Sequence, residues 1–249
     1  MKNKFREITI RFFAKFLPEP KSRAVILMYH SVGGNGKFFN VKPSDFESQM
    51  KFLNSSGYQV VTLPELCSNL RKKESLEKMV AITFDDGYSD FLGNALPVLK
   101  KHKFPATVFV ITGQTGGDKM TREDLSSLAD DPLVTLMPHT HTHPDLGKLN
   151  ITEALSEINN SRLEIEKITG KPANILAYPK GKYTKELKRE LDNSGNWLAA
   201  VTVKPGLVKS GDGLFELKRI PIDSAVSQKL FPSLLTRGMD LYESLKIWK

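Results

Sequence analysis

Short apolar runs alternate along the chain with longer stretches in which apolar residues recur every three to four positions. The short runs are rich in β-branched residues and end at a glycine, a proline or a polar residue, which is typical of buried strands. The longer stretches have the spacing of amphipathic helices. The predicted strands are 24–30, 58–62, 80–84, 106–111, 133–137, 174–178, 197–203 and 215–220.

Predicted helices lie between these strands. Ser44 to Glu47 has the signature of a capping box, and Thr121 to Asp124 is expected to cap a short helix. The other helices are expected from Pro64 onward and at 90–101, 152–168 and 184–192. Strand–helix alternation repeated seven or eight times implies a parallel sheet with right-handed crossovers. At 249 residues, it favours a single closed α/β barrel over an open sheet.

The first twenty residues differ from the rest of the chain. Residues 1–20 are predicted to form a basic amphipathic segment, and residues 21–249 a single domain, because no linker or repeat divides them. The segment begins like a signal peptide, but Arg11 and Lys15 interrupt its apolar region and no small-residue cleavage site follows. Its apolar residues at helical spacing are Phe5, Ile8, Phe12, Phe13 and Phe16, and Lys4 and Arg6 also lie among them.

This segment has two interpretations. A basic amphipathic helix can lie on an anionic membrane surface. Alternatively, the helix packs its phenylalanines on the barrel. No run of apolar residues is long enough to span a bilayer. We therefore expect a cytoplasmic protein, in peripheral contact with the inner face of the cell membrane if the first interpretation holds.

The charge balance narrows the range of partners. A net charge of +8 and a pI of about 9.4 favour anionic partners such as acidic glycans, lipid headgroups, diphosphate-linked sugars or nucleic acid. No nucleic-acid-binding motif is recognisable, so we expect no nucleic acid partner. The single cysteine, Cys67, cannot form an internal disulfide and lies in an apolar stretch, so we expect a core residue.

Polar side chains gather at the carboxyl ends of four predicted strands. His30, the pair Asp85-Asp86, the histidines from 139 to 143, and Tyr178-Pro179-Lys180 each end or follow a strand. In a β/α barrel these ends form one face, where active sites are built. The adjacent aspartates repel each other and stay ionised only if a cation or several donors lie between them. The alternative is a strand-end turn that caps the next helix.

The histidine run has the spacing of a metal site. If residues 139–143 turn helically, His139 and His143 face the same way; if they are extended, His141 shares the face too, so spacing alone does not choose among the three. Two imidazoles and one carboxylate suit Zn²⁺, or another first-row divalent ion such as Co²⁺ or Ni²⁺, in a hydrolytic site. The second aspartate is then free to act as a base. The alternative is a polar surface loop.

Two of these stretches resemble the motifs of a known family. Thr83-Phe84-Asp85-Asp86-Gly87-Tyr88 and the run from His139 to Leu146 are similar to the first two motifs of the NodB-like polysaccharide deacetylases, carbohydrate esterase family four. The resemblance extends from about 24 to 235. It implies a distorted (β/α)₇ barrel, the NodB homology domain, that removes acetyl groups from N-acetylated sugars.

The resemblance assigns roles by position. It implies that Asp85 is the general base and that Asp86, His139 and His143 hold the metal, while His141 is a neighbour. It also implies that the backbone N–H of Lys180 stabilises the oxyanion. A general acid must then protonate the leaving amine.

The chain departs from the family pattern at two roles. No histidine follows His143, so the acid that many members draw from the C-terminal region is expected to be His30 instead. Tyr29-His30 resembles the poly-N-acetylglucosamine deacetylase branch, and the alternative is that His30 only packs against Tyr29 and the loop. The arginine that orients the base is also missing. Arg219 is predicted to replace it through a charge-assisted bond to Asp85, unless it is a surface residue.

The loops carry two further departures. Lys180 stands where an aromatic residue is common, which could favour an anionic substrate. Met137-Pro138 replace a Gly-Ser pair before His139.

These observations predict a metal-dependent sugar N-deacetylase. The expected substrate is an N-acetylated saccharide of a surface polysaccharide, a lipopolysaccharide or its lipid-linked precursor. Two alternatives remain at this point. The protein could be a catalytically silent sugar-binding protein, or a deacetylase of a small non-sugar amide.

Overall fold

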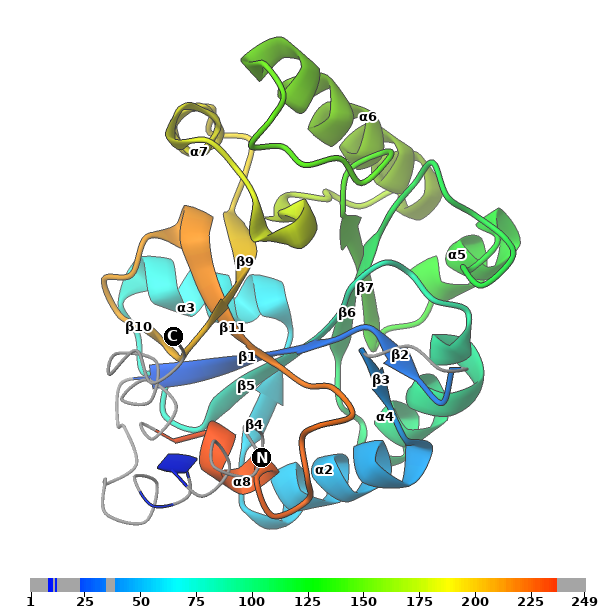
Figure 1. The fold of residues 1–249 in the computed structure, drawn as a ribbon, viewed down its shortest axis with the longest axis vertical. Coiled ribbons are helices and arrows are strands. Elements are labelled where there is room, and N and C mark those ends of the chain that lie inside the picture. Colours follow the sequence, from blue (N-terminus) through cyan, green and yellow to red (C-terminus); the bar gives the residue numbers. More distant parts are fainter. Residues whose placement is uncertain (1–8, 11, 13–22, 35–38, 237–249) are drawn as a thin grey trace.

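A parallel sheet rolled into a nearly closed barrel forms the centre of the molecule (Figure 1). The computed structural model describes residues 9–10, 12, 23–34 and 39–236. Within these residues, the ring of parallel strands has the order β7-β6-β5-β1-β11-β9-β8. Their bounds are β1 Arg23–Tyr29, β5 Met79–Phe84, β6 Ala106–Val110, β7 Val134–Pro138, β8 Ile175–Ala177, β9 Ala199–Pro205 and β11 Leu217–Pro221.

The two ends of this sheet meet at β7 and β8. His139, just after β7, contacts the carbonyl of Ala177 at the end of β8, with 2.8 Å between its Nδ1 and the oxygen. The ring follows chain order, with β1 between β5 and β11. The predicted (β/α)₇ barrel is therefore confirmed, and all carboxyl ends of the parallel strands lie at one rim.

One predicted barrel strand is only a short addition to the ring. β4 (Gln59–Val61) pairs with the first half of β5, from Met79 to Ala81. β6 pairs with the second half of the same edge, from Ile82 to Phe84. Because β4 and β6 share one edge of β5, β4 does not reach the carboxyl rim. The shorter strands β2 (Ser31–Val32), β3 (Asn40–Val41) and β10 (Val208–Lys209) lie outside the ring order.

The barrel strands are buried along most of their length, as their apolar runs predict. Every residue of β5 is buried, and in β1 only the first residue is partly exposed. Burying such strands between helices and the barrel interior removes apolar surface from water, which is the main favourable term in folding. Cys67 is fully buried in this core, as predicted.

Helices cover the outside of the barrel (Figure 1). They are α2 Pro43–Ser55, α3 Leu63–Lys72, α4 Leu96–His102, α5 Arg122–Ala129, α6 Ile151–Thr169, α7 Lys185–Asn193 and α8 Phe231–Leu234. Short turns of other helix types are Phe91–Ala95 (a π turn), Pro179–Gly181 and Leu214–Glu216 (both 3₁₀).

Two helix starts differ from the prediction. The expected capping box at Ser44 is wrong, because the helix begins at Pro43 and its N-cap, Lys42, makes no side-chain cap bond. Proline at the first helical position already has the φ angle of a helix and lacks an N–H that would need a partner. The predicted helix from 90 begins with the π turn Phe91–Ala95 before α4. Thr121 caps α5 as predicted.

The predicted amphipathic segment lies mostly outside the described residues. Its membrane and packing interpretations therefore both stay predictions, as does the domain boundary near residue 20. Within the part of the chain that the structure describes, no helix has the length and apolar character needed to cross a membrane.

Candidate active site

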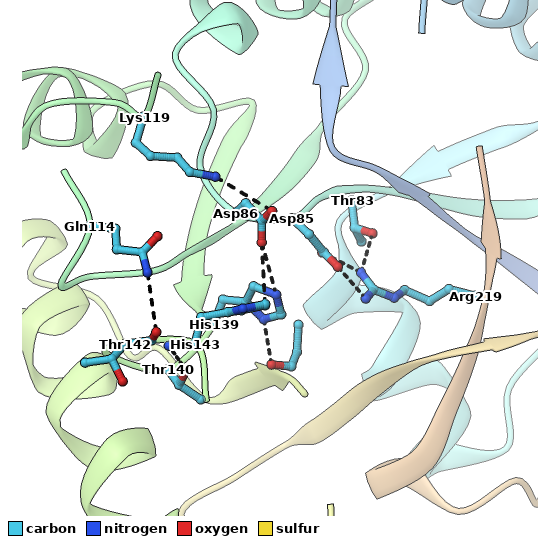
Figure 2. A network of polar contacts seen from close by, with 11 residues as sticks. Thr83, Asp85, Asp86, Gln114, Lys119, His139, Thr140, Thr142, His143 and Arg219 are labelled. Carbon is cyan, nitrogen blue, oxygen red and sulfur yellow. Dashed lines mark hydrogen bonds and ion pairs between the residues drawn. The ribbon is translucent and has the colours of Figure 1, made fainter. Parts of the chain in front are cut away.

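Asp85, Asp86, His139 and His143, four of the polar residues predicted at the strand ends, lie close together (Figure 2). Asp85 and Asp86 directly follow β5, and His139 directly follows β7. Arg219 belongs to β11, on the other side of β1. Strands far apart in the sequence therefore supply neighbouring side chains, as expected for a β/α barrel.

Asp85 forms a buried bidentate ion pair with Arg219. Both lines from the arginine to Asp85 are visible in Figure 2, with 2.7 Å from Nη1 to Oδ1 and 2.7 Å from Nη2 to Oδ2. The arginine is 0% exposed and the aspartate 2% exposed. The alternative of a surface arginine is therefore wrong, and the contact expected between these two residues is present.

The rest of the guanidinium is also held. Its Nε donates to the carbonyl of Thr202 at 2.9 Å, and Nη1 donates to the Thr83 hydroxyl at 3.1 Å. That hydroxyl donates in turn to the carbonyl of Leu27 at 2.6 Å. A buried charge is tolerated when its donors find acceptors in this way. The network fixes the plane of the Asp85 carboxylate.

Asp85 is ionised at neutral pH. Its burial acts to raise the pKa, but the charge and hydrogen bonds of Arg219 outweigh burial and hold the pKa well below its ordinary value. Each carboxylate oxygen has two lone-pair sites, so the bond from Arg219 leaves acceptor capacity on both. Asp85 can thus accept a further proton or hydrogen bond at the rim.

Asp86, His139 and His143 form a cluster that fits a metal ion. Oδ1 of Asp86 lies 3.5 Å from Nε2 of His139 and 3.8 Å from Nε2 of His143. Ligand atoms placed tetrahedrally about 2.0–2.1 Å from a zinc ion lie about 3.4 Å from one another. All three donor atoms lie within 4.8 Å of each other, so the spacing and the donor types suit such an ion.

Neighbouring groups set the tautomer of His139 and the charge of His143. Nδ1 of His139 lies 2.8 Å from the Ala177 carbonyl, which can only accept, so the proton is on Nδ1 and the Nε2 lone pair faces Asp86. Burial and the neighbouring His139 lower the pKa of His143 to about 4, although Asp86 opposes this. His143 is therefore neutral at pH 7, as a metal ligand must be.

His141 lies outside the cluster. Its Nδ1 is 3.1 Å from the Thr112 hydroxyl and 3.8 Å from Oε2 of Glu164. Thr140 and His143 both have left-handed backbone, with φ of 67° and 63°, so the segment is neither a helix nor an extended strand. The structure thus brings His139 and His143, and not His141, next to Asp86.

His30 directly follows β1 and is partly buried at the rim. Its ring stacks on Phe39, with 4.7 Å between centroids. Burial lowers its pKa, and the charges of Asp85 and Asp86 offset part of that effect by favouring the protonated ring. The ring is therefore close enough to Asp85 and Asp86 for their charges to act on its pKa. The alternative for His30 is that it only packs against Tyr29 and the loop. The stacking on Phe39 is one such packing contact with the loop.

Lys180 lies in the turn after β8. Its backbone is left-handed, with φ of 55°, and the two hydrogen bonds that close the turn are donated by Gly181 and Lys182. A Cβ on Gly181 would lie 2.5 Å from the Cγ2 of Val203, so only glycine fits there. The Lys180 side chain is exposed.

Two functional neighbours were missed by the sequence reasoning. Lys119 places its ammonium 3.7 Å from Oδ2 of Asp86 and 3.2 Å from the centre of the Tyr88 ring. Glu157, on α6, accepts hydrogen bonds from the backbone N–H groups of His141 and Thr142. The signal for Lys119 was available, because it lies in the glycine-containing loop after a predicted strand. No comparable signal identifies Glu157.

Fold and site together define a β/α barrel whose carboxyl rim carries an Asp-His-His cluster that could hold a metal ion. Residues 72–196, half of the chain, match the family model for polysaccharide deacetylases. YxkH of Bacillus subtilis, named as a polysaccharide deacetylase, is 33% identical over 216 residues, which cover 86% of this chain and 76% of YxkH. The chain therefore belongs to the polysaccharide deacetylase family, which confirms the resemblance and the enzyme class.

Other relatives agree with this assignment. The poly-β-1,6-N-acetyl-D-glucosamine N-deacetylase of Staphylococcus aureus is 32% identical over 159 residues, which cover 58% of this chain and 55% of that protein. The Streptococcus pyogenes deacetylase PplD, solved with acetate, superposes with a TM-score of 0.79 at 27% identity, covering 87% of this chain and 99% of PplD. IcaB from Ammonifex degensii shares the fold, with a TM-score of 0.76 at 22% identity.

The buried ion pair predicts a strong coupling in stability. We expect Arg219→Met and Asp85→Leu each to lower the free energy of unfolding by about 3–5 kcal/mol, because each leaves one buried charge unpaired. The double variant should lose less than either single variant. Urea unfolding of the four proteins measures this. If the loss in the free energy of unfolding of the double variant equals the sum of the two single losses, the two residues are not coupled. Lys101→Met, which breaks the exposed pair with Glu47, is the control and should cost little.

The same pair predicts a pH dependence. The pKa of Asp85 is lower in the folded than in the unfolded state, so its contribution is complete above the unfolded value of about 3.9 and is lost as the pH falls. Wild type should therefore lose stability more steeply than the Asp85→Leu/Arg219→Met double variant from about pH 5 to about pH 2. Urea unfolding at several pH values tests this, and parallel losses would refute it.

The cluster predicts which histidines bind metal. Apo-protein titrated calorimetrically with Zn²⁺ should bind one ion, and His143→Ala should lower the affinity by more than about 100-fold, since loss of an outer-shell partner alone costs about 10–100-fold. His141→Ala is the matched control, from the same loop, and should change the affinity by no more than a few-fold. An equal loss in both variants would show that the cluster is assigned wrongly.

Proposed function

We propose that this protein is a metal-dependent hydrolase that removes N-acetyl groups from an N-acetylated sugar polymer. The observation that carries the proposal is the ionised Asp85, fixed by Arg219 beside the Asp86–His139–His143 cluster. A base next to a group of metal donors is the combination that hydrolysis of an unactivated amide needs. Membership of the polysaccharide deacetylase family supports the type of substrate.

The residues divide the reaction among them. A divalent ion held by the cluster would polarise the acetyl carbonyl and lower the pKa of a water molecule. Asp85 takes the proton of that water, and Arg219 keeps the acceptor oxygens aimed at the rim. Because the pKa of Asp85 is low, it is a weak base and depends on a water that is already acidified.

The developing charges need two further groups. The backbone N–H of Lys180 donates a hydrogen bond to the oxyanion. His30 delivers a proton to the amine nitrogen as the C–N bond breaks, so that acetate and a free amino sugar leave. Burial lowers the pKa of His30, and the charges of Asp85 and Asp86 offset part of this effect by favouring the protonated form, which is the form that can donate.

The substrate proposal has a finer part. The relative named for poly-β-1,6-N-acetyl-D-glucosamine points to an N-acetylglucosamine polymer, although the chain spans only 55% of that protein. The basic pI of about 9.4 and the exposed Lys180 support an anionic or lipid-linked precursor of a surface polysaccharide or lipopolysaccharide. We keep the cytoplasmic location and the contact with the inner membrane face as part of this proposal.

One of the two arguments for a catalytically silent sugar-binding protein is weaker in the light of the contact between Arg219 and Asp85. This alternative was based on the missing arginine and the missing C-terminal histidine. The contact of Arg219 with both carboxylate oxygens of Asp85 supports the proposal that it replaces that arginine. A protein without catalysis would have no need for a base fixed in this way. The small-amide alternative keeps the same chemistry and differs only in its substrate.

Acetate release tests the proposed function. Apo-protein re-supplied with Zn²⁺, Co²⁺ or Ni²⁺ should release acetate from chitooligosaccharides or poly-N-acetylglucosamine. Asp85→Asn should lower kcat by about 10²–10⁴-fold, because it removes the base, while calorimetry shows that Zn²⁺ still binds. His141→Ala is the control and should keep its activity.

Two results would contradict this expectation. Full metal-dependent acetate release by Asp85→Asn would exclude Asp85 as the base. Glycan binding by the wild type without acetate release, with every metal, would favour the silent binder.

A further inference from the structure

Two side chains of the helix that follows the aspartates hold the backbone of a single residue on another strand. Oδ1 of Asp90 accepts a hydrogen bond from the N–H of Val32 at 3.3 Å. Nδ2 of Asn94 donates to the carbonyl of the same residue at 2.7 Å. Val32 is fully buried in β2. Both polar groups of its peptide backbone are therefore bound by side chains from one turn.

Asp90 also binds the neighbour of Val32. Its second oxygen, Oδ2, accepts a hydrogen bond from the Ser31 hydroxyl, and Ser31 is 1% exposed. Asp90 thus contacts the two residues that directly follow His30 in the chain. Its carboxylate uses both oxygens for this one segment.

The segment is closely fitted around the carboxylate. A Cβ on Gly34 would lie 2.3 Å from the Ser31 hydroxyl oxygen and 2.6 Å from Oδ2 of Asp90. Only glycine allows the chain to pass at this distance. The backbone after His30 therefore follows the carboxylate of Asp90 closely. Such a close fit restricts the residues that the loop can contain, which suggests that the position of the loop matters for function.

The turn that carries these side chains has an uncommon form. Asp90 precedes, and Asn94 belongs to, the π turn Phe91–Ala95. π turns are rare and occur frequently at functional sites. Neither Asp90 nor Asn94 has a role in the proposed hydrolysis, so the turn has no explanation in the chemistry described above.

The position of His30 explains why this turn is held so firmly to residues 31 and 32. On its amino side, the carbonyl of Tyr29 accepts from the backbone N–H of Asp85 at 2.9 Å, which ties the end of β1 to the base. On its carboxyl side, Asp90 holds Ser31 and Val32. The backbone of His30 is thus fixed at both neighbours by the same chain segment, 85–90.

We propose that Asp90, assisted by Asn94, is a positioning residue for the general acid. It holds residues 31–32 so that the ring of His30 stays within reach of the leaving amine. This inference rests on the proposed function, in which His30 is the acid. Asp90 does not touch the substrate; its effect passes entirely through His30.

Two substrates of different leaving-group quality test the proposal. An N-acetylated sugar oligomer needs a proton on its departing nitrogen, whereas 4-nitrophenyl acetate releases nitrophenolate without one. His30→Ala should lower kcat for the amide by about 10²–10⁴-fold and for the ester by no more than a few-fold. Asp90→Ala should follow the same pattern with a loss of about 10–100-fold, because misplacing a catalytic group by about 1 Å costs about 100-fold.

The double variant and the conservative variant separate positioning from folding. In the His30→Ala background, Asp90→Ala should cause no further loss on the amide, because the group it positions is gone. Asp90→Asn, which keeps one acceptor oxygen for Val32, should retain more activity than Asp90→Ala. If Asp90→Ala does not fold, Asn94→Ala and Asp90→Asn replace it, and their amide and ester rates are measured alone and in the His30→Ala background.

Asp131→Ala is the matched control. Asp131 also accepts from a backbone N–H, that of Leu133, and from a side chain, that of Lys100, but it lies at the amino end of β7, away from the rim. It should leave both rates unchanged.

The outcomes distinguish a failure of the positioning role of Asp90 from a failure of the proposed deacetylase function. If wild type releases acetate but Asp90→Ala lowers amide and ester turnover equally, or its loss persists in the His30→Ala background, the positioning role is wrong and the deacetylase stands. If wild type releases no acetate from any amide, both fall.

Discussion

The buried ion pair between Arg219 and Asp85 is the constraint on which the site depends. It joins β11, near the end of the chain, to β5 across the intervening β1. A charge in this position needs partners for its polar atoms, and each of the three guanidinium nitrogens donates to at least one acceptor among Asp85, Thr83 and Thr202. Because these partners belong to distant parts of the sequence, the orientation of the base requires the barrel to be assembled.

The same pair gives the two adjacent aspartates different surroundings. Asp85 faces a permanent cation, whereas Asp86 has left-handed backbone, with φ of 72°, and directs its carboxylate to the histidines. The two carboxylates therefore have separate partners instead of competing for one. Lys119 lies near the Asp86 oxygen Oδ2, while Oδ1 faces the histidines. Left-handed backbone at a residue other than glycine costs free energy. It recurs at this rim at Thr140, His143 and Lys180, and away from the rim at Lys73, Lys78 and Lys103.

The sequence predicted what depends on local pattern. Apolar runs located the strands, their alternation with helices predicted the barrel, and residues after strand ends predicted the rim. Spacing alone could not choose among His139, His141 and His143, since their relative directions depend on the φ angles of Thr140 and His143, and only the family resemblance separated them. The sequence left Arg219 undecided between core and surface, because its partner is 134 positions away. The capping box at Ser44 failed for a local reason, the proline before it, and the π turn has no signal in the spacing of apolar residues.

The ring order gives a physical reason for an acid on the first strand. β1 lies between β5, which carries the base, and β11, which carries Arg219, so a histidine at its end necessarily neighbours the base. The turn with Lys180 follows β8, which lies across the ring from β1. In a tetrahedral adduct, the oxyanion and the leaving nitrogen project from the carbon in different directions. An acid on β1 and an oxyanion donor after β8 approach from different sides, so the proposed roles are compatible without a C-terminal histidine.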